Sequence, residues 1–81
     1  MSHTPHELAE EFPDRVDQMS QMKQSDAHFS KLFDEYHDIN RAVHRAEVDI
    51  EPTDDLHMAE MRKTRLAIKD EIWSMLLAEK A

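Results

Sequence analysis

Residues 27–49, which read AHFSKLFDEYHDINRAVHRAEVD, carry the pattern that decides the fold. Large apolar residues recur there, and just beyond, at intervals of seven: Phe29, Tyr36, Val43 and Ile50. The second position of the same heptad is taken by Leu32, Ile39 and Ala46. Such a seam is typical of a helix that packs along one face against another helix, as in a coiled coil. We predict one helix over residues 27–49, roughly 35 Å long at 1.5 Å per residue.

A second long helix is predicted for residues 54–79. Pro52 ends the first helix, because proline lacks an N–H donor and does not continue a helix. Asp54 and Asp55 then place negative charge in the first turn of the second helix, where the helix dipole favours anions. Because the connection is short, the two helices are expected to be antiparallel neighbours.

The predicted fold is therefore all-α, an antiparallel hairpin of two long helices with a short N-terminal helix or helices. Apolar residues on the facing sides of the two long helices are expected to form its core: Phe29, Leu32, Phe33, Tyr36, Ile39, Val43, Met61, Ile68, Ile72 and Met75.

The second long helix carries another apolar stripe. It lies roughly 90° from the first on a helical projection. Its members are Ala59, Leu66, Trp73 and Leu77. A helix with two apolar stripes usually contacts two neighbours. The hairpin supplies one, and the other is either the N-terminal segment or a second copy of the chain, so these four residues are the candidate interaction surface.

The N-terminal part is weakly patterned. Residues 1–12 are expected to be a flexible or fraying extension, because Leu8 and Phe12 are their only large apolar residues besides Met1. Pro13 interrupts any helix there. Residues 13–24 are predicted to form a short helix. Residues 1–81 together make a single small domain.

Composition narrows the classes of function. The 81 residues include no cysteine and no glycine, and 10 basic against 18 acidic residues give a formal net charge of −8. This charge argues against broad binding to nucleic acid or anionic membranes. No apolar run approaches the ~20 residues that span a bilayer. The first twelve residues resemble neither a signal peptide nor a transit peptide, so a cytoplasmic location is expected.

Two runs resemble the YdcH family, small bacterial proteins classed as a domain of unknown function. The family's opening helix is similar to HFSKLF at residues 28–33, with the Tyr36, Ile39-Asn40 and Val43 that follow. Its second helix is similar to RLAIKDEI at residues 65–72. Ala27 stands where many members have proline, and residues 1–12 have no counterpart. The resemblance implies a helical hairpin in a bacterial cytoplasmic protein, and it implies no activity and no functional residues.

No catalytic, cofactor or metal site is predicted. The six histidines suggest a metal site, but helical ligands must share a face three or four residues apart. The best group is Asp34, His37 and Asp38, and solvated surface residues are the simpler interpretation. The acidic residues from Glu47 to Asp55 do not have calcium-loop spacing and include no glycine. The serines have no nucleophile context, so the chain is not expected to be an enzyme.

One basic run stands out on this acidic chain: Arg62, Lys63, Arg65 and Lys69. We expect these side chains to pair across the hairpin with Asp34, Glu35, Asp38 or Glu47. The favoured function is a protein–protein interaction or self-association module. A nucleic-acid-associated factor that uses the basic run is an alternative, and a metal-binding protein that uses its histidines is a second.

Overall fold

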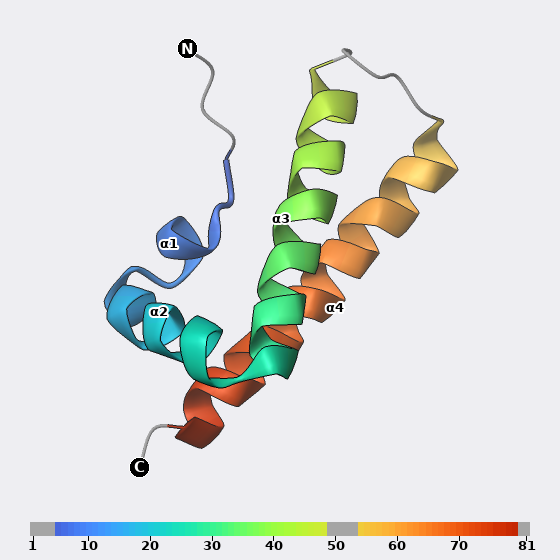
Figure 1. Ribbon diagram of the computed structural model, residues 1–81. Helices are drawn as coiled ribbons and strands as arrows, with labels where there is room; N and C mark the ends of the chain where they lie inside the picture. Colours follow the sequence, from blue (N-terminus) through green and yellow to red (C-terminus); the bar gives the residue numbers. More distant parts are fainter. Residues whose placement is uncertain (1–4, 49–53, 80–81) are drawn as a thin grey trace.

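The computed structural model describes residues 5–48 and 54–79, all of them helical or in short connections (Figure 1). The elements in chain order are α1 (Leu8–Glu11), the 3-10 turn η1 (Pro13–Arg15), α2 (Val16–Ser25), α3 (Ala27–Glu47) and α4 (Asp55–Glu79). Helices α3 and α4 run antiparallel and pack against each other, which confirms the predicted all-α hairpin. None of the described helices is both long and apolar enough to cross a membrane.

Aspartate side chains fix where the long helices begin. The Asp26 carboxylate accepts hydrogen bonds from the backbone N–H groups of His28, at 3.0 Å, and Phe29, at 3.1 Å. The Asp54 carboxylate accepts one from the N–H of His57 at 2.7 Å. These bonds satisfy donors that have no partner within the helix. Asp54 therefore caps α4 from just before its first residue, and Pro52 lies outside the described residues.

The N-terminal segment, residues 5–25, lies against the hairpin (Figure 1). The expectation of a fraying extension over residues 1–12 is wrong for residues 8–12, because Leu8 is only 1% exposed and Phe12 packs against the core. A four-residue helix is not stable alone, so the burial of Leu8 and Phe12 supplies stability that the helix's own hydrogen bonds cannot. Residues 1–4 lie outside the described part.

Pro13 divides the segment as the sequence indicated. Phe12 precedes it with φ −130° and ψ 64°, outside the helical region, as a residue before proline usually is. The helix predicted over 13–24 is split, because residues 13–15 form the 3-10 turn and α2 begins at Val16.

The core lies where the N-terminal segment meets the hairpin. Its buried cluster consists of Leu8, Met19, Met22, Phe29, Leu32, Tyr36, Ile72 and Leu76. Of the residues predicted for the hairpin core, Phe29, Leu32, Tyr36, Val43 and Ile72 are buried. The others are partly buried, namely Phe33, Ile39, Met61, Ile68 and Met75. The prediction missed Leu8, Met19 and Met22, because it considered only the two long helices, and it also left out Leu76, which lies on α4 itself.

Replacing Leu8 with alanine tests the docking of the N-terminal segment. The L8A variant should lose about 2–5 kcal/mol of unfolding free energy, since it leaves a cavity in the core. Urea unfolding followed by circular dichroism measures the loss.

Leu56 provides the matched control, because it is 73% exposed. The L56A variant should change stability by less than about 0.5 kcal/mol. Equal stability losses in L8A and L56A would contradict a docked N-terminal segment.

Candidate functional site

Two buried polar side chains of α3 hold the N-terminal segment in place. The Tyr36 hydroxyl donates to the backbone carbonyl of His6 at 2.7 Å, and the Asn40 amide donates to the carbonyl of Pro5 at 2.9 Å. Tyr36 is 0% exposed and Asn40 is 1% exposed. His6 has a φ of 62°, in the left-handed region, which costs roughly 1–2 kcal/mol for a residue other than glycine. The two bonds help to stabilise this conformation.

Asn40 also reaches the second long helix. Its Oδ1 accepts a hydrogen bond from Arg65 Nη1 at 3.1 Å. One buried amide therefore joins the N-terminal segment, α3 and α4, and we call this arrangement the Asn40 link. Among the described residues, no buried side-chain nitrogen or oxygen lacks a hydrogen-bond partner. The orientation of the Arg65 guanidinium is thus set by a group that is itself fixed.

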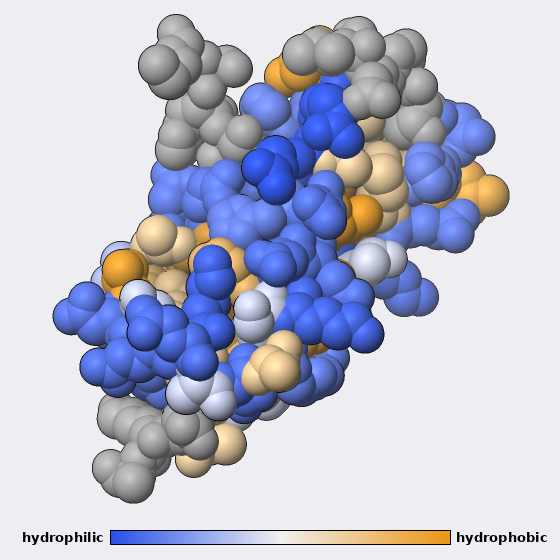
Figure 2. Space-filling view, in the orientation of Figure 1, coloured by the Kyte–Doolittle hydropathy of each residue, from blue (hydrophilic) through white to orange (hydrophobic). Residues whose placement is uncertain are grey.

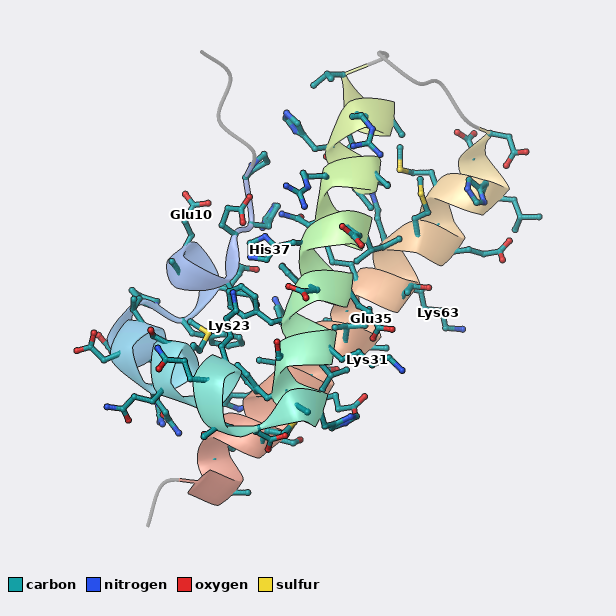
Figure 3. The ribbon with its side chains drawn as sticks, viewed as in Figure 1. Glu10, Lys23, Lys31, Glu35, His37 and Lys63 are labelled. Atoms are coloured by element: carbon teal, nitrogen blue, oxygen red, sulfur yellow. The ribbon has the colours of Figure 1, made fainter. Side chains whose placement is uncertain are left out.

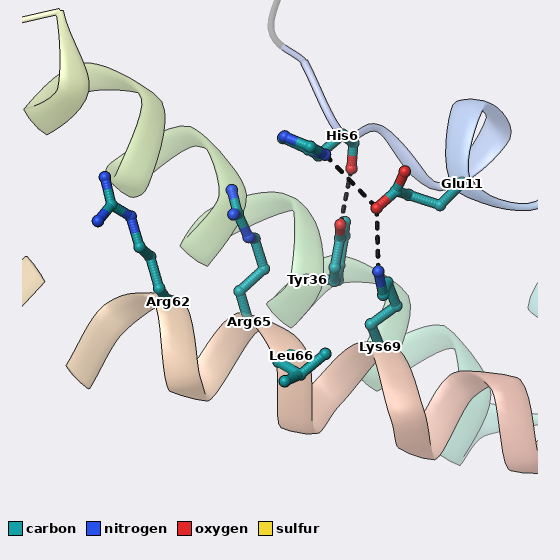
Figure 4. Close-up of a pocket in the computed structure, with 7 residues that line it drawn as sticks. All are labelled: His6, Glu11, Tyr36, Arg62, Arg65, Leu66 and Lys69. Carbon is teal, nitrogen blue, oxygen red and sulfur yellow. Dashed lines mark hydrogen bonds and ion pairs between the residues drawn. The ribbon is translucent and has the colours of Figure 1, made fainter. Parts of the chain in front are cut away.

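A pocket of about 250 Å³ lies between the N-terminal segment and the hairpin (Figure 4). Its lining residues come from all three parts of the fold: His6, Glu11, Tyr36, Arg62, Arg65, Leu66 and Lys69. We call it the basic pocket. Three of its cations are spaced i, i+3 and i+7 along α4, which places them on one face of the helix. The pocket therefore gathers positive charge on a chain whose net charge is −8.

Neighbouring carboxylates offset part of this charge. Lys69 Nζ lies 3.0 Å from Glu11 Oε1, and Arg62 Nη2 lies 2.9 Å from Glu47 Oε2. The expected pairing of Arg62 with Glu47 is confirmed, whereas Lys69 pairs with the N-terminal segment instead of α3. Within residues 5–48 and 54–79, Arg65 forms no ion pair, and its hydrogen-bond partner is the neutral amide of Asn40.

The pocket alters the acidity of two groups. The pKa of the Tyr36 hydroxyl is raised to about 12, mainly by burial and also by the negative charges of Glu11 and Glu7, against the effect of Arg65. Burial would also raise the pKa of the Glu11 carboxyl, but the hydrogen bond and charge of Lys69, together with His6, outweigh it. The pKa of Glu11 is therefore below its ordinary value. Glu11 stays ionised and Tyr36 stays protonated near neutral pH.

The second apolar stripe of α4, which we call the α4 stripe, remains largely exposed. Leu66 is 53% exposed, Leu77 is 47% exposed and Trp73 is 37% exposed, and Ala59 is also exposed. Trp73 is partly covered by the N-terminal segment: the Phe12 ring stacks on it at 5.1 Å and 12°, and the Arg15 guanidinium lies 5.2 Å from its centroid. The N-terminal segment is thus one neighbour of this stripe, but it leaves both leucines half exposed.

Lys63, His28 and His37 lie outside the basic pocket, whereas His6 lines it. Lys63 is exposed and projects away from the N-terminal segment (Figure 3). His37 Nδ1 lies 2.9 Å from a Glu7 oxygen, and His28 Nε2 lies 3.0 Å from Glu71. In the described part of the chain, no group of three or more histidine, aspartate or glutamate residues could hold a metal ion.

This fold defines a small helical hairpin covered on one side by an N-terminal segment. The sequence model of a family described as "Protein of unknown function (DUF465)" matches residues 29–76, more than half of the chain. The chain belongs to this family, which is the YdcH-like family that the two runs resemble. The match spans α3 and most of α4 and does not include the N-terminal segment. Searches of curated proteins and of solved structures returned no match.

Tyr36 allows a direct test of its own burial against the N-terminal segment, because it is the only tyrosine in the chain. Its phenolate absorbance in the folded protein should titrate with a midpoint near pH 12. In concentrated guanidinium chloride the midpoint should fall to about 10, the value of an exposed tyrosine.

The same shift predicts the alkaline limit of stability. The folded chain binds the phenolic proton more tightly than the unfolded chain does. The stability that the buried, protonated Tyr36 contributes is therefore fully present below about pH 10. It is lost as the pH rises through about 12. A folded-state midpoint near 10 would show that Tyr36 is not buried against the N-terminal segment.

Proposed function

We propose that this protein is a helical interaction module that associates with itself through the α4 stripe. The observation that supports this proposal is the exposure of Leu66 and Leu77 after the N-terminal segment has docked. A complex is stabilised when a partner buries apolar area that was exposed to water. Fully burying one leucine side chain contributes about 1.5–3 kcal/mol. A small domain gains much from such association, since its own core is limited.

A second partly apolar surface, which shares no residue with the α4 stripe, lies between α3 and α4. The view in Figure 2 is mostly hydrophilic, with hydrophobic colour between α3 and α4. A shallow groove between these helices is lined by Glu35, Asp38, Ile39, Ala42, Thr64 and Ile68. An apolar centre with a polar rim is common at protein interfaces.

The alternatives draw less support from the geometry. Nucleic-acid binding through the basic run would compete with Glu47 and Glu11, which pair with Arg62 and Lys69.

The proposal assigns no catalytic activity to the chain. It includes a bacterial origin and a cytoplasmic location, as the family resemblance implies.

Self-association is tested by replacing both exposed leucines of the stripe. The wild-type protein should form a dimer or tetramer by light scattering over a range of concentrations. The double variant L66S/L77S should dissociate about 10- to 100-fold more readily, since the exposed halves of the two leucines contribute roughly 1.5–3 kcal/mol together when buried. Circular dichroism should show unchanged helicity, because both positions lie on the surface.

Leu56 again supplies the control, since it is an exposed leucine of α4 outside the stripe. The L56S variant should keep the wild-type mass. A wild-type protein that is monomeric at every concentration, or a double variant that keeps its mass, would refute self-association through this stripe.

A further inference from the structure

The basic pocket has the properties of a preorganised anion site. Arginine has five N–H donors, and the Arg65 Nη1 bond to Asn40 leaves the others for a ligand. Because Asn40 is buried and also bonded to the Pro5 carbonyl, it holds the Arg65 guanidinium in one orientation. A guanidinium held in this way loses little side-chain entropy on binding a ligand. Within the described residues its charge has no carboxylate partner.

A second guanidinium is available at low cost. Arg62 lies one helical turn from Arg65, on the same side of α4 as His6 and Lys69 (Figure 4). Its bond to Glu47 is a surface ion pair, with the two side chains 51% and 34% exposed. Such pairs contribute little to stability, so Arg62 can turn toward a ligand without a large loss.

The charge and size of the pocket define the ligand. The lining residues Arg62, Arg65 and Lys69 carry three positive charges and Glu11 carries one negative charge, which leaves a net charge of +2. Glu47, which pairs with Arg62 from outside the lining, offsets one of these charges until Arg62 turns toward a ligand. A phosphate monoester carries about −1.5 to −2 at neutral pH, whereas a carboxylate carries about −1. The volume of about 250 Å³ is below the ~300–1,000 Å³ typical of sites for drug-sized ligands. A compact dianion fits these properties best.

We propose that the basic pocket binds the phosphate group of a small molecule, with Arg65 as its fixed ligand and Arg62 as its second. The flat, forked donors of arginine match phosphate oxygens in pairs. Lys69 contributes charge from α4 while it remains bonded to Glu11. The N-terminal segment forms one wall through His6 and Glu11, so a bound phosphate also stabilises its docked position. All residues of the site come from one chain, and Leu66 belongs both to its lining and to the α4 stripe.

Calorimetric titration with inorganic phosphate, at low ionic strength and in a phosphate-free buffer, tests the proposal. The wild-type chain should show saturable binding, and R65Q should weaken it about tenfold or more, since hydrogen bonds to charged groups contribute roughly 1.5–3 kcal/mol. R62Q should also weaken it, and because Arg62 is half exposed, this variant covers the case in which R65Q does not fold. Circular dichroism checks the fold of each variant.

The matched control is K63Q, which removes one positive charge from the same helix but outside the pocket (Figure 3). It should bind phosphate as the wild type does. Glycerol 3-phosphate distinguishes a phosphate monoester from free phosphate, and the tighter of the two identifies the source of the phosphate group.

Four results would overturn the proposal. The first is that neither phosphate compound gives saturable heat, and the second is that K63Q and R65Q weaken phosphate binding equally. The third is that acetate binds as tightly as phosphate. The fourth is that a short oligonucleotide binds more tightly than either phosphate compound. The last result would assign the charge to nucleic acid instead.

Discussion

Two hydrogen bonds, from Tyr36 and Asn40 to the carbonyls of His6 and Pro5, determine how the N-terminal segment sits on the hairpin. The apolar contacts of Leu8 and Phe12 attract the segment, but apolar burial has no directional preference. Buried donors do have one, because each costs about 1–3 kcal/mol if it is left without an acceptor. Adjacent carbonyls of one segment satisfy both donors. The register of the segment on α3 is therefore set by polar groups inside an apolar interface.

The basic pocket follows from this register. Once Pro5 and His6 are fixed, Glu11 comes within bonding distance of Lys69, and Phe12 stacks on Trp73. The same Asn40 amide that binds Pro5 also positions Arg65 on α4. Docking of the N-terminal segment and orientation of the arginine are thus consequences of one buried residue. A change in the docking of the segment should therefore alter the orientation of Arg65, and the reverse.

The sequence predicted the hairpin well because its signal is periodic. Two local features are visible in the side-chain pattern alone: the heptad from Phe29 to Val43 and the break at Pro13. Whether the N-terminal segment docks was left open for a physical reason: the acceptors of its hydrogen bonds are backbone carbonyls, which every residue has, so the sequence does not show which of them are used. Asn40 was visible only as a polar residue beside the apolar seam, and nothing local showed that it would be buried.

The candidate site was only half predictable. The spacing of Arg62, Arg65 and Lys69 placed three cations on one face of a helix, and Glu47 was expected to pair there. The wall formed by His6 and Glu11 could not be predicted, because it depends on where the N-terminal segment docks. For the α4 stripe, the prediction that a second neighbour exists was half answered, since the N-terminal segment covers part of Trp73 and leaves Leu66 and Leu77 half exposed.

The Asn40 link can be observed directly by nuclear magnetic resonance on the isotope-labelled chain. The two side-chain amide hydrogens of Asn40 should exchange slowly with water and should show nuclear Overhauser contacts to Pro5 and to the Arg65 guanidinium. Rapid exchange of these hydrogens, with no contact to Pro5, would contradict the claim that a buried amide joins the N-terminal segment to both long helices.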